Sequence, residues 1–194
     1  MRQTLAMSEQ ELWLVRHGET EWSRDGRHTS TTDLRLLPEG EEVARGLAAR
    51  LAGEDFVLVL TSPRLRARRT AVLAGFVDAE PTEDLAEWAY GDYEGRTTAD
   101  VRRMVPGWTI WTHPSPGGES ADDVARRVDR VIARARAADG PTLAFGHGHS
   151  LRVLAARWLG LPPTDGRLLR LETASVSVLG YERETPVVRR WNCA

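Results

Sequence analysis

Three short apolar segments, each followed at once by polar residues, constrain the fold of this chain more than any other feature. They are LWLV (12–15), FVLVL (56–60) and TLAF (142–145). Uninterrupted apolar runs of this length are typical of strands in a parallel sheet, because helices cover both faces of such a sheet. We therefore predict three central parallel strands, each of which ends at a polar segment.

Amphipathic segments between these strands predict helices. In residues 38–53, Val43, Leu47 and Leu51 share one helical face. Residues 120–137 repeat this spacing with Val124, Val128, Val131 and Ala135. Each of these helices would pack its apolar face on the sheet.

Serine residues mark three predicted helix starts. Ser62 precedes Pro63 and would cap one helix, and Ser150 would cap another. Ser120 stands three residues before Asp123, which is the spacing of a capping box. We expect each serine hydroxyl to accept a hydrogen bond from the first turn of its helix.

The chain ends in two alternating segments, 175–181 and 186–191, which predict a hairpin at a sheet edge. Strands and helices otherwise alternate, so the predicted fold is α/β, a three-layer sandwich with a mostly parallel central sheet and helices on both faces. A length of 194 residues suits a single domain over 1–194. The irregular, aromatic-rich segment 87–118 predicts an insertion, either a lid over the site or a small core of its own.

Charge and composition limit the partners and the location of the protein. A formal net charge of -2 argues against a wide basic surface for nucleic acid. The single cysteine, Cys193, excludes an internal disulfide, and no segment has the length and apolarity of a signal peptide or membrane span. We expect a cytoplasmic protein that contacts neither nucleic acid nor membrane, and a homodimer is possible.

Histidine and arginine follow the predicted strands where parallel strands place ligand sites, at their carboxyl ends. Arg16 and His17 follow the first strand, and Arg66 lies one turn into the helix after the second. His147 and His149 follow the third. Their convergence would form a cationic cup for a compact anion such as phosphate.

A structural role and a metal site are the alternatives for these histidines. A lone histidine after a strand is more often structural, but three segments that converge favour a site. His147 and His149 would also suit a metal ion, but carboxylate and histidine partners at the usual spacings are missing, so we expect no metal and no cofactor. The sequence contains no GxxxxGK[ST], no GxGxxG after a strand and no GxSxG, which argues against nucleotide sites and serine hydrolases.

Five ordered segments resemble motifs of the histidine phosphatase superfamily, the phosphoglycerate mutase-like proteins. They are LVRHGETEW, TSPRLRARRTA, LAEWAYGDYEG, PGGES and FGHGHSLR. The resemblance implies that His17 is the nucleophile, that Arg16, Arg66 and His147 hold the phosphoryl group, and that Glu87 is the proton donor. Glu19, Glu94 and Glu119 are lower-ranked donors, and we favour structural roles for the last two.

The charges expected around His17 agree with this resemblance. Two neighbouring arginines should lower the pKa of His17 and keep it neutral, and a protonated His147 would add positive charge at the phosphoryl oxygens. The segment GRHTSTTDLRLLPEG and Ser23 depart from the family pattern. The residues predicted to contact substrate at the rim of the site are Ser23, His28, Thr29, Ser30 and His149. For His28, Thr29 and Ser30, a plain loop role is an equal alternative.

The expected activity is metal-independent hydrolysis of small phosphomonoesters, such as sugar or other metabolite phosphates, through a phosphohistidine. This resembles most the bacterial acid phosphatase branch of the family. Two alternatives remain open: phosphoglycerate mutase activity, and a non-catalytic protein that binds a phosphorylated ligand.

Overall fold

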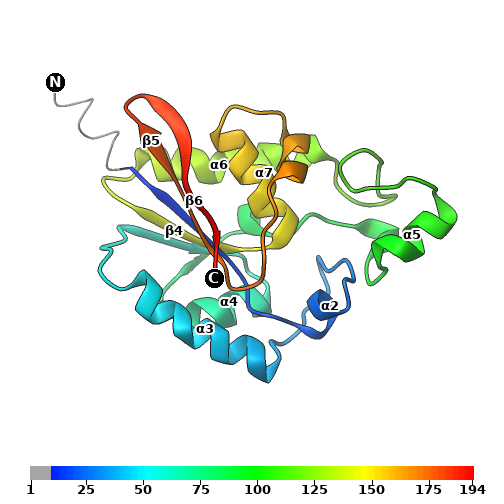
Figure 1. Ribbon diagram of the computed structural model, residues 1–194, viewed down its shortest axis with the longest axis horizontal. Helices are drawn as coiled ribbons and strands as arrows, with labels where there is room; N and C mark the ends of the chain where they lie inside the picture. Colours follow the sequence, from blue (N-terminus) through cyan, green and yellow to red (C-terminus); the bar gives the residue numbers. More distant parts are fainter. Residues whose placement is uncertain (1–9) are drawn as a thin grey trace.

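The computed structural model describes residues 10–194 (Figure 1). The expectation that the chain begins without an export signal falls largely on residues 1–9 and lies outside the described residues. The strands are β1 (Leu12–Arg16), β2 (Leu58–Thr61), β3 (Glu80–Pro81), β4 (Thr142–Gly146), β5 (Val176–Glu182) and β6 (Thr185–Cys193). The helices are α2 (Glu21–Arg24), α3 (Pro38–Leu51), α4 (Leu65–Leu73), α5 (Thr98–Met104), α6 (Ala121–Ala137) and α7 (Gly148–Trp158), with 3-10 turns η1 (Glu83–Leu85), η2 (Gly91–Tyr93) and η3 (Pro163–Leu168).

The six strands form one sheet in the order β3-β2-β4-β1-β5-β6. β1 pairs parallel with β4, and β2 pairs parallel with both β4 and β3. β5 runs antiparallel to both β1 and β6, and β5 and β6 form a hairpin at one edge of the sheet. The predicted mostly parallel sheet and the terminal hairpin are confirmed.

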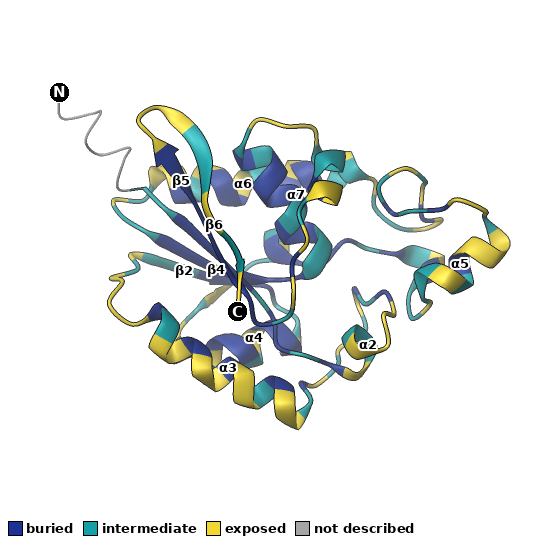
Figure 2. Ribbon diagram, viewed as in Figure 1, coloured by how far each residue is buried: buried dark blue, intermediate teal, exposed yellow. Residues whose placement is uncertain are grey.

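Helices cover both faces of the sheet, as Figure 1 shows. Alternate side chains of β1 enter different cores: Leu12 and Leu14 pack in the cluster with α6 and α7, whereas Trp13 and Val15 pack in the cluster with α3 and α4. β1, β4 and β5 are almost wholly buried, whereas the edge strand β6 is partly exposed (Figure 2). Because successive side chains of a strand point to opposite faces, the uninterrupted apolar runs supply both cores, which confirms the three-layer fold.

One predicted helix face is shifted in the structure. Leu47 and Leu51 of α3 are buried as expected, but Val43 is 54% exposed, and Ala44 takes its place. The cause lies at Gly40, where an added Cβ would stand 2.4 Å from the carbonyl oxygen of Glu19. This close approach turns the Gly40 side of α3 toward the loop after β1 and leaves Val43 in solvent.

Two of the three predicted serine caps are wrong. α4 begins at Leu65, and α7 begins at Gly148 with His147 at the N-cap position, so neither Ser62 nor Ser150 caps its helix. The backbone N–H of Ser150 instead donates to the Glu87 carboxylate at 2.8 Å, because this carboxylate occupies the N-terminus of α7. The capping box of Ser120 and Asp123 is confirmed.

The aromatic-rich segment 87–118 contains η2 and α5 and lies beyond the carboxyl ends of β1 and β4 (Figure 1). Trp88, Tyr90 and Trp108 are at most 2% exposed, and they belong to the same apolar cluster as α6 and α7. The segment therefore shares the main core on that face. Its function as a lid stays a prediction. Within residues 10–194, no helix is long and apolar enough to cross a membrane.

Candidate active site

The ends of β1 and β4 bring two histidines together. Arg16 pairs with Gly146 in parallel register, and the next residue of each strand enters the same space. The His17 N–H donates to the Gly146 carbonyl at 3.0 Å. As a result, the rings of His17 and His147 pack edge to face with their centroids 5.1 Å apart.

A cavity of about 230 Å³ opens beside His17. Of the residues predicted for the site, its walls include Arg16, His17, Ser23, His28, Thr29, Glu87 and His149. Arg66 and His147 are completely buried and do not line the cavity. The structure therefore gathers the five predicted catalytic residues and most of the predicted substrate contacts at one end of the sheet.

One hydrogen bond fixes the tautomer of His17. Its Nδ1–H donates to the Gly18 carbonyl at 2.7 Å, which leaves Nε2 of the neutral ring without a proton. Burial lowers the pKa of His17 well below its usual value, and the charges of Arg66 and Arg16 lower it further. The expected effect of the two arginines is present, but desolvation is the larger cause.

The two arginines are only partly satisfied by protein groups. Arg66 donates to the carbonyls of Thr29, Ser30 and Thr32 at 3.0 to 3.2 Å, and Arg16 donates to Leu171 O at 2.6 Å. The Nε–H groups of both are buried without a partner among the described residues. Since an unpaired buried donor is costly, two such donors beside His17 suit an anion that accepts from both.

His147 is completely buried, and only one of its ring nitrogens has a partner among the described residues. Its Nε2 lies 2.7 Å from the Ser62 hydroxyl, and its buried Nδ1 has no partner among the described residues. Burial, followed by the charges of Arg66 and His17, lowers the pKa of His147 well below its usual value. A lowered pKa favours the neutral ring in the absence of an anion, and a protonated His147 at a bound phosphoryl group stays a prediction.

Glu87 is 7% exposed and accepts three backbone hydrogen bonds. Oε1 accepts from Trp88 N at 2.9 Å and Ser150 N at 2.8 Å, whereas Oε2 accepts only from His149 N at 3.0 Å. Two of these donors belong to the first turn of α7, where a helix attracts negative charge. An added Cβ on Gly148 would stand 3.5 Å from the Arg16 guanidinium and 3.7 Å from Oε2, so both groups flank Gly148.

Of the two serines predicted to contact substrate, one lines the cavity and one does not. Ser30 does not line the cavity, because its N–H and hydroxyl bind the Glu94 carboxylate. Ser23 lines the cavity, but its hydroxyl is shared with the backbone of Thr20 in the capping box of α2. Ser30 is therefore a residue that holds the loop, and Ser23 contacts the cavity mainly through its position.

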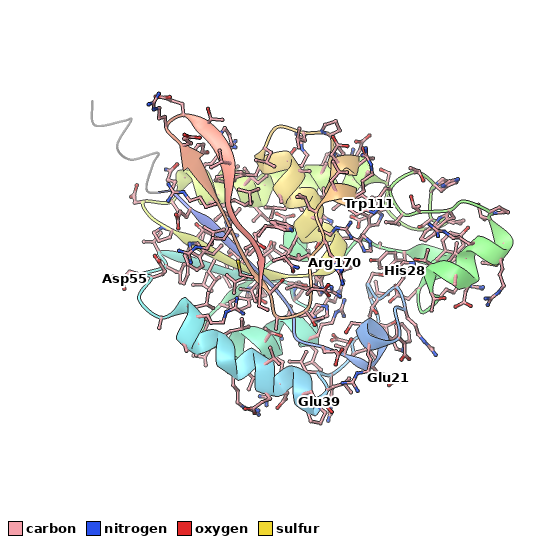
Figure 3. All side chains as sticks on the ribbon, viewed as in Figure 1. Glu21, His28, Glu39, Asp55, Trp111 and Arg170 are labelled. Atoms are coloured by element: carbon pink, nitrogen blue, oxygen red, sulfur yellow. The ribbon has the colours of Figure 1, made fainter. Side chains whose placement is uncertain are left out.

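His28 and His149 form an aromatic wall of the cavity together with Tyr90. The Tyr90 hydroxyl lies 2.6 Å from His149 Nδ1, and the His28 ring lies 4.7 Å from that of Tyr90. In Figure 3, His28 and Trp111 lie between the sheet and α5. Burial lowers the pKa of His28 to about 4, so this wall is uncharged at neutral pH.

The rival carboxylates have structural partners. Glu94 accepts from the backbone N–H groups of Ser30 and Thr32 at 2.9 to 3.0 Å. Glu119 forms an ion pair with Arg127 at 2.9 Å, and Glu19 forms one with Arg24 at 2.6 Å. None of the three lines the cavity, which agrees with the structural roles favoured for Glu94 and Glu119.

Sequence reasoning missed several cavity residues: Arg27, Thr98 and Arg152. Arg152 could have been found, because it stands four residues after Gly148 in the segment FGHGHSLR and so shares its helical face. Its guanidinium stacks on Trp111 at 4.7 Å and donates to Gly166 O at 3.0 Å. Nothing local in the sequence distinguishes Arg27 or Thr98.

Comparison with known proteins gives relatives with the same segments. The chain is 43% identical over 176 residues to an acid phosphatase of Mycobacterium tuberculosis, which covers 88% of this chain and 86% of that protein. It is 36% identical to a sedoheptulose 1,7-bisphosphatase of Saccharomyces cerevisiae, over 76% of this chain and 67% of that one. The solved structure of an open reading frame product of Mycobacterium tuberculosis matches with a TM-score of 0.90 at 39% identity, over 95% and 97% of the two chains.

A family model gives the same answer over nearly the entire length of the chain. It is described as the histidine phosphatase superfamily (branch 1) and matches residues 12–194. The match begins with β1, which delivers His17, and includes β4, which delivers His147. With this match and with phosphatases among its relatives, the chain belongs to the histidine phosphatase superfamily (branch 1).

Proposed function

We propose that this protein is a metal-independent phosphatase that hydrolyses small phosphomonoesters through a phosphohistidine at His17. The observation that carries the proposal is the hydrogen bond from His17 Nδ1–H to the Gly18 carbonyl. It fixes the tautomer in which Nε2 has a free lone pair beside the buried guanidinium groups. The names of the phosphatase relatives support the same reaction class.

In the first step, His17 Nε2 forms a bond to phosphorus while the bond from phosphorus to the alcohol oxygen breaks. Glu87 gives its proton to that oxygen. In the second step, a water oxygen bonds to phosphorus, the N–P bond breaks, and Glu87 takes a proton from the water. Oε2 is the better carrier of this proton, because it accepts one N–H bond where Oε1 accepts two.

Charge neutralisation in this mechanism comes from side chains. Arg16 and Arg66 each offer a buried, unpartnered Nε–H, and His147 offers a buried Nδ1. Binding of a phosphate dianion would oppose the lowering of the His147 pKa and favour its protonated form. Among residues 10–194, no three His, Cys, Asp or Glu side chains are grouped to hold a metal ion.

The cavity volume supports a small leaving group. About 230 Å³ suits a phosphoryl group with a sugar-sized or smaller alcohol. Phosphate release from p-nitrophenyl phosphate and from a panel of phosphorylated metabolites tests the proposal, with His17→Ala as the control. Binding without phosphate release would show a non-catalytic protein, and phosphoryl transfer between carbons of phosphoglycerate that needs a bisphosphate primer would show a mutase.

A further inference from the structure

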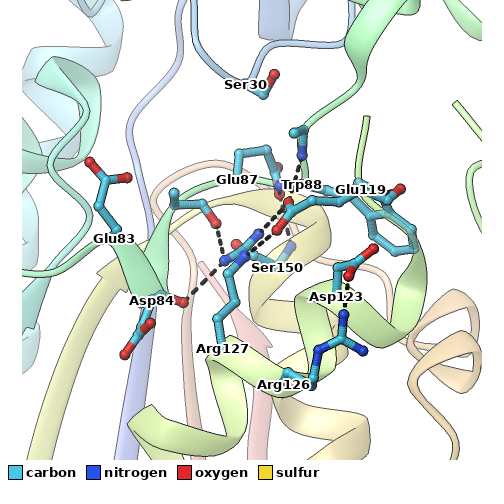
Figure 4. A network of polar contacts seen from close by, with 12 residues as sticks. Ser30, Glu83, Asp84, Glu87, Trp88, Glu119, Asp123, Arg126, Arg127 and Ser150 are labelled. Atoms are coloured by element: carbon cyan, nitrogen blue, oxygen red, sulfur yellow. Dashed lines mark hydrogen bonds and ion pairs between the residues drawn. The ribbon is translucent and has the colours of Figure 1, made fainter. Parts of the chain in front are cut away.

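One ion pair holds the backbone on both sides of Glu87. Arg127 of α6 donates from Nε to Glu119 Oε1 at 2.9 Å and from Nη2 to Oε2 at 3.1 Å. Figure 4 shows the guanidinium between the Glu119 carboxylate and the segment that carries Glu87. Such a bidentate contact fixes the orientation of both side chains.

Each partner of the pair also binds the main chain next to Glu87. Arg127 Nη1 donates to the carbonyl of Ala86 at 2.6 Å, one residue before Glu87. The Ala89 N–H, two residues after Glu87, donates to Glu119 Oε2 at 2.9 Å. The indole N–H of Trp88 donates to the Glu119 carbonyl at 2.8 Å. The ion pair therefore grips the chain before and after the carboxylate.

The Arg127 guanidinium lies in a buried, apolar layer, where a charged group loses hydration. The Arg127 side chain is only 10% exposed and projects from the same face of α6 as the completely buried Val124 and Val128. A guanidinium in an apolar layer loses hydration, and apolar side chains at such positions are often as stable or more stable. Stability alone therefore gives a weak reason for an arginine here.

The backbone is shaped to allow the contact. An added Cβ on Gly118 would stand 2.3 Å from the Ala89 carbonyl oxygen, so only glycine lets the two segments approach. This approach also lets the Glu119 N–H donate to that carbonyl at 2.9 Å. Neither Arg127 nor Glu119 lines the cavity, so neither can touch a substrate there.

We propose that the ion pair of Arg127 and Glu119 is a positioning device for proton transfer by Glu87. It holds the backbone of residues 86–89 so that Oε2 faces the oxygen of the leaving alcohol. The inference rests on the proposed function, in which Glu87 donates the proton. A general acid loses much of its effect when it is displaced by about an ångström, which gives a modest backbone shift a measurable cost.

Leaving groups of different basicity separate positioning from general damage. p-Nitrophenolate is a stable anion and departs without a proton, whereas the alkoxide of β-glycerophosphate needs one. The value of kcat/KM reports the steps up to departure of the alcohol and is independent of the later hydrolysis of the phosphohistidine. Misplacement of Glu87 should therefore lower kcat/KM for β-glycerophosphate more than for p-nitrophenyl phosphate.

The variants are Arg127→Lys, which keeps the charge without the bidentate geometry, and Glu119→Gln. The double variant Arg127→Met with Glu119→Gln leaves no unpaired buried charge and serves if a single variant does not fold. Arg157→Gln is the matched control, because Arg157 forms a bidentate pair with Asp129 between α7 and α6, away from the cavity, at 3.0 and 3.1 Å. Circular dichroism checks that each variant is folded.

In Glu87→Gln, we expect kcat/KM to fall much more for β-glycerophosphate than for p-nitrophenyl phosphate. In the Arg127 and Glu119 variants, the fall in kcat/KM should be about tenfold larger for β-glycerophosphate than for p-nitrophenyl phosphate. Arg157→Gln should leave kcat/KM unchanged for both substrates. Equal losses on both substrates, or none, in folded Arg127 and Glu119 variants would overturn the inference while a selective Glu87→Gln leaves the proposed function standing. If Glu87→Gln itself is unselective, the assigned proton donor is wrong.

Discussion

The rings of His17 and His147 lie with their centroids 5.1 Å apart, where the parallel strands β1 and β4 end side by side. Both imidazoles are buried, and burial with the nearby arginine charges lowers the pKa of each well below its usual value. One neutral ring can then attack phosphorus while the other accepts a proton as negative charge arrives. This contact between two distant segments is the physical basis of the proposed reaction.

Replacement of His17 tests the nucleophile. His17→Ala should abolish phosphate release, because no other side chain at the cavity offers a free imidazole nitrogen in the same position. Rapid quenching of the unaltered protein with labelled substrate should trap a phosphoenzyme that is stable in base and labile in acid, as expected of a P–N bond. An adduct that is labile in base would identify a carboxylate as the phosphorylated group.

Replacement of Glu87 separates proton transfer from binding. Glu87→Gln should lower kcat for β-glycerophosphate by about 10²-fold or more, which is typical of the loss of a general acid. Inorganic phosphate or vanadate should still bind to this variant. Calorimetric titration with vanadate measures the binding. Loss of vanadate binding would show that Glu87 is needed to form the anion site, since its carboxylate holds the first turn of α7 at 2.8 to 3.0 Å.

Glu94 should control substrate binding through the loop that holds Arg66. Its carboxylate binds the N–H groups of Ser30 and Thr32, whose carbonyls accept from Arg66 at 3.2 and 3.1 Å. Glu94→Gln should raise KM about tenfold, since hydrogen bonds to a charged group contribute roughly 1.5–3 kcal/mol. Steady-state kinetics check this, and a fall in kcat at constant KM would contradict it.

His28 should make the stability of the protein depend on pH. Burial lowers its pKa to about 4 in the folded state, against about 6.5 in the unfolded chain. Between these values the unfolded chain binds the additional proton, so the free energy of unfolding falls as the pH drops from about 6.5 to about 4. The integrated loss is about 3 kcal/mol.

Urea unfolding of the wild type and of His28→Gln at pH 6.5 and pH 4.5 measures this contribution. The variant should lose less stability over this range than the wild type, whatever its stability at pH 6.5. Equal losses in the two proteins would mean that His28 titrates normally in the folded state.

Chelation tests the source of the positive charge at the phosphoryl group. In the proposed mechanism Arg16 and Arg66 neutralise the phosphoryl oxygens, so treatment with EDTA should leave kcat and KM unchanged. Inactivation by EDTA that a divalent metal reverses would contradict this mechanism and would require a metal site at the cavity.

Local patterns were enough to predict the three central strands, the terminal hairpin and the layers, but not β3. Apolar runs must be covered on both faces, and the carboxyl ends of parallel strands meet at one edge, so Arg16, His17 and His147 had to converge. The capping box at Ser120 was predictable because Ser120 and its partner Asp123 lie within one helical turn. The position of Val43 was not, because the contact of Gly40 with Glu19 sets the orientation of α3.

Tertiary structure alone decided how the site is held. Two of the three N–H groups that bind Glu87, the carboxylate that holds Ser30 and the guanidinium that binds Ala86 come from segments 41 to 64 residues away in the chain. The sequence by itself determined the apolar residues of the central strands and where those strands end, because these follow from periodicity and backbone preference. The partners of buried polar groups depend on packing between distant elements, since such a group binds whichever donor or acceptor the folded chain places within about 3 Å of it.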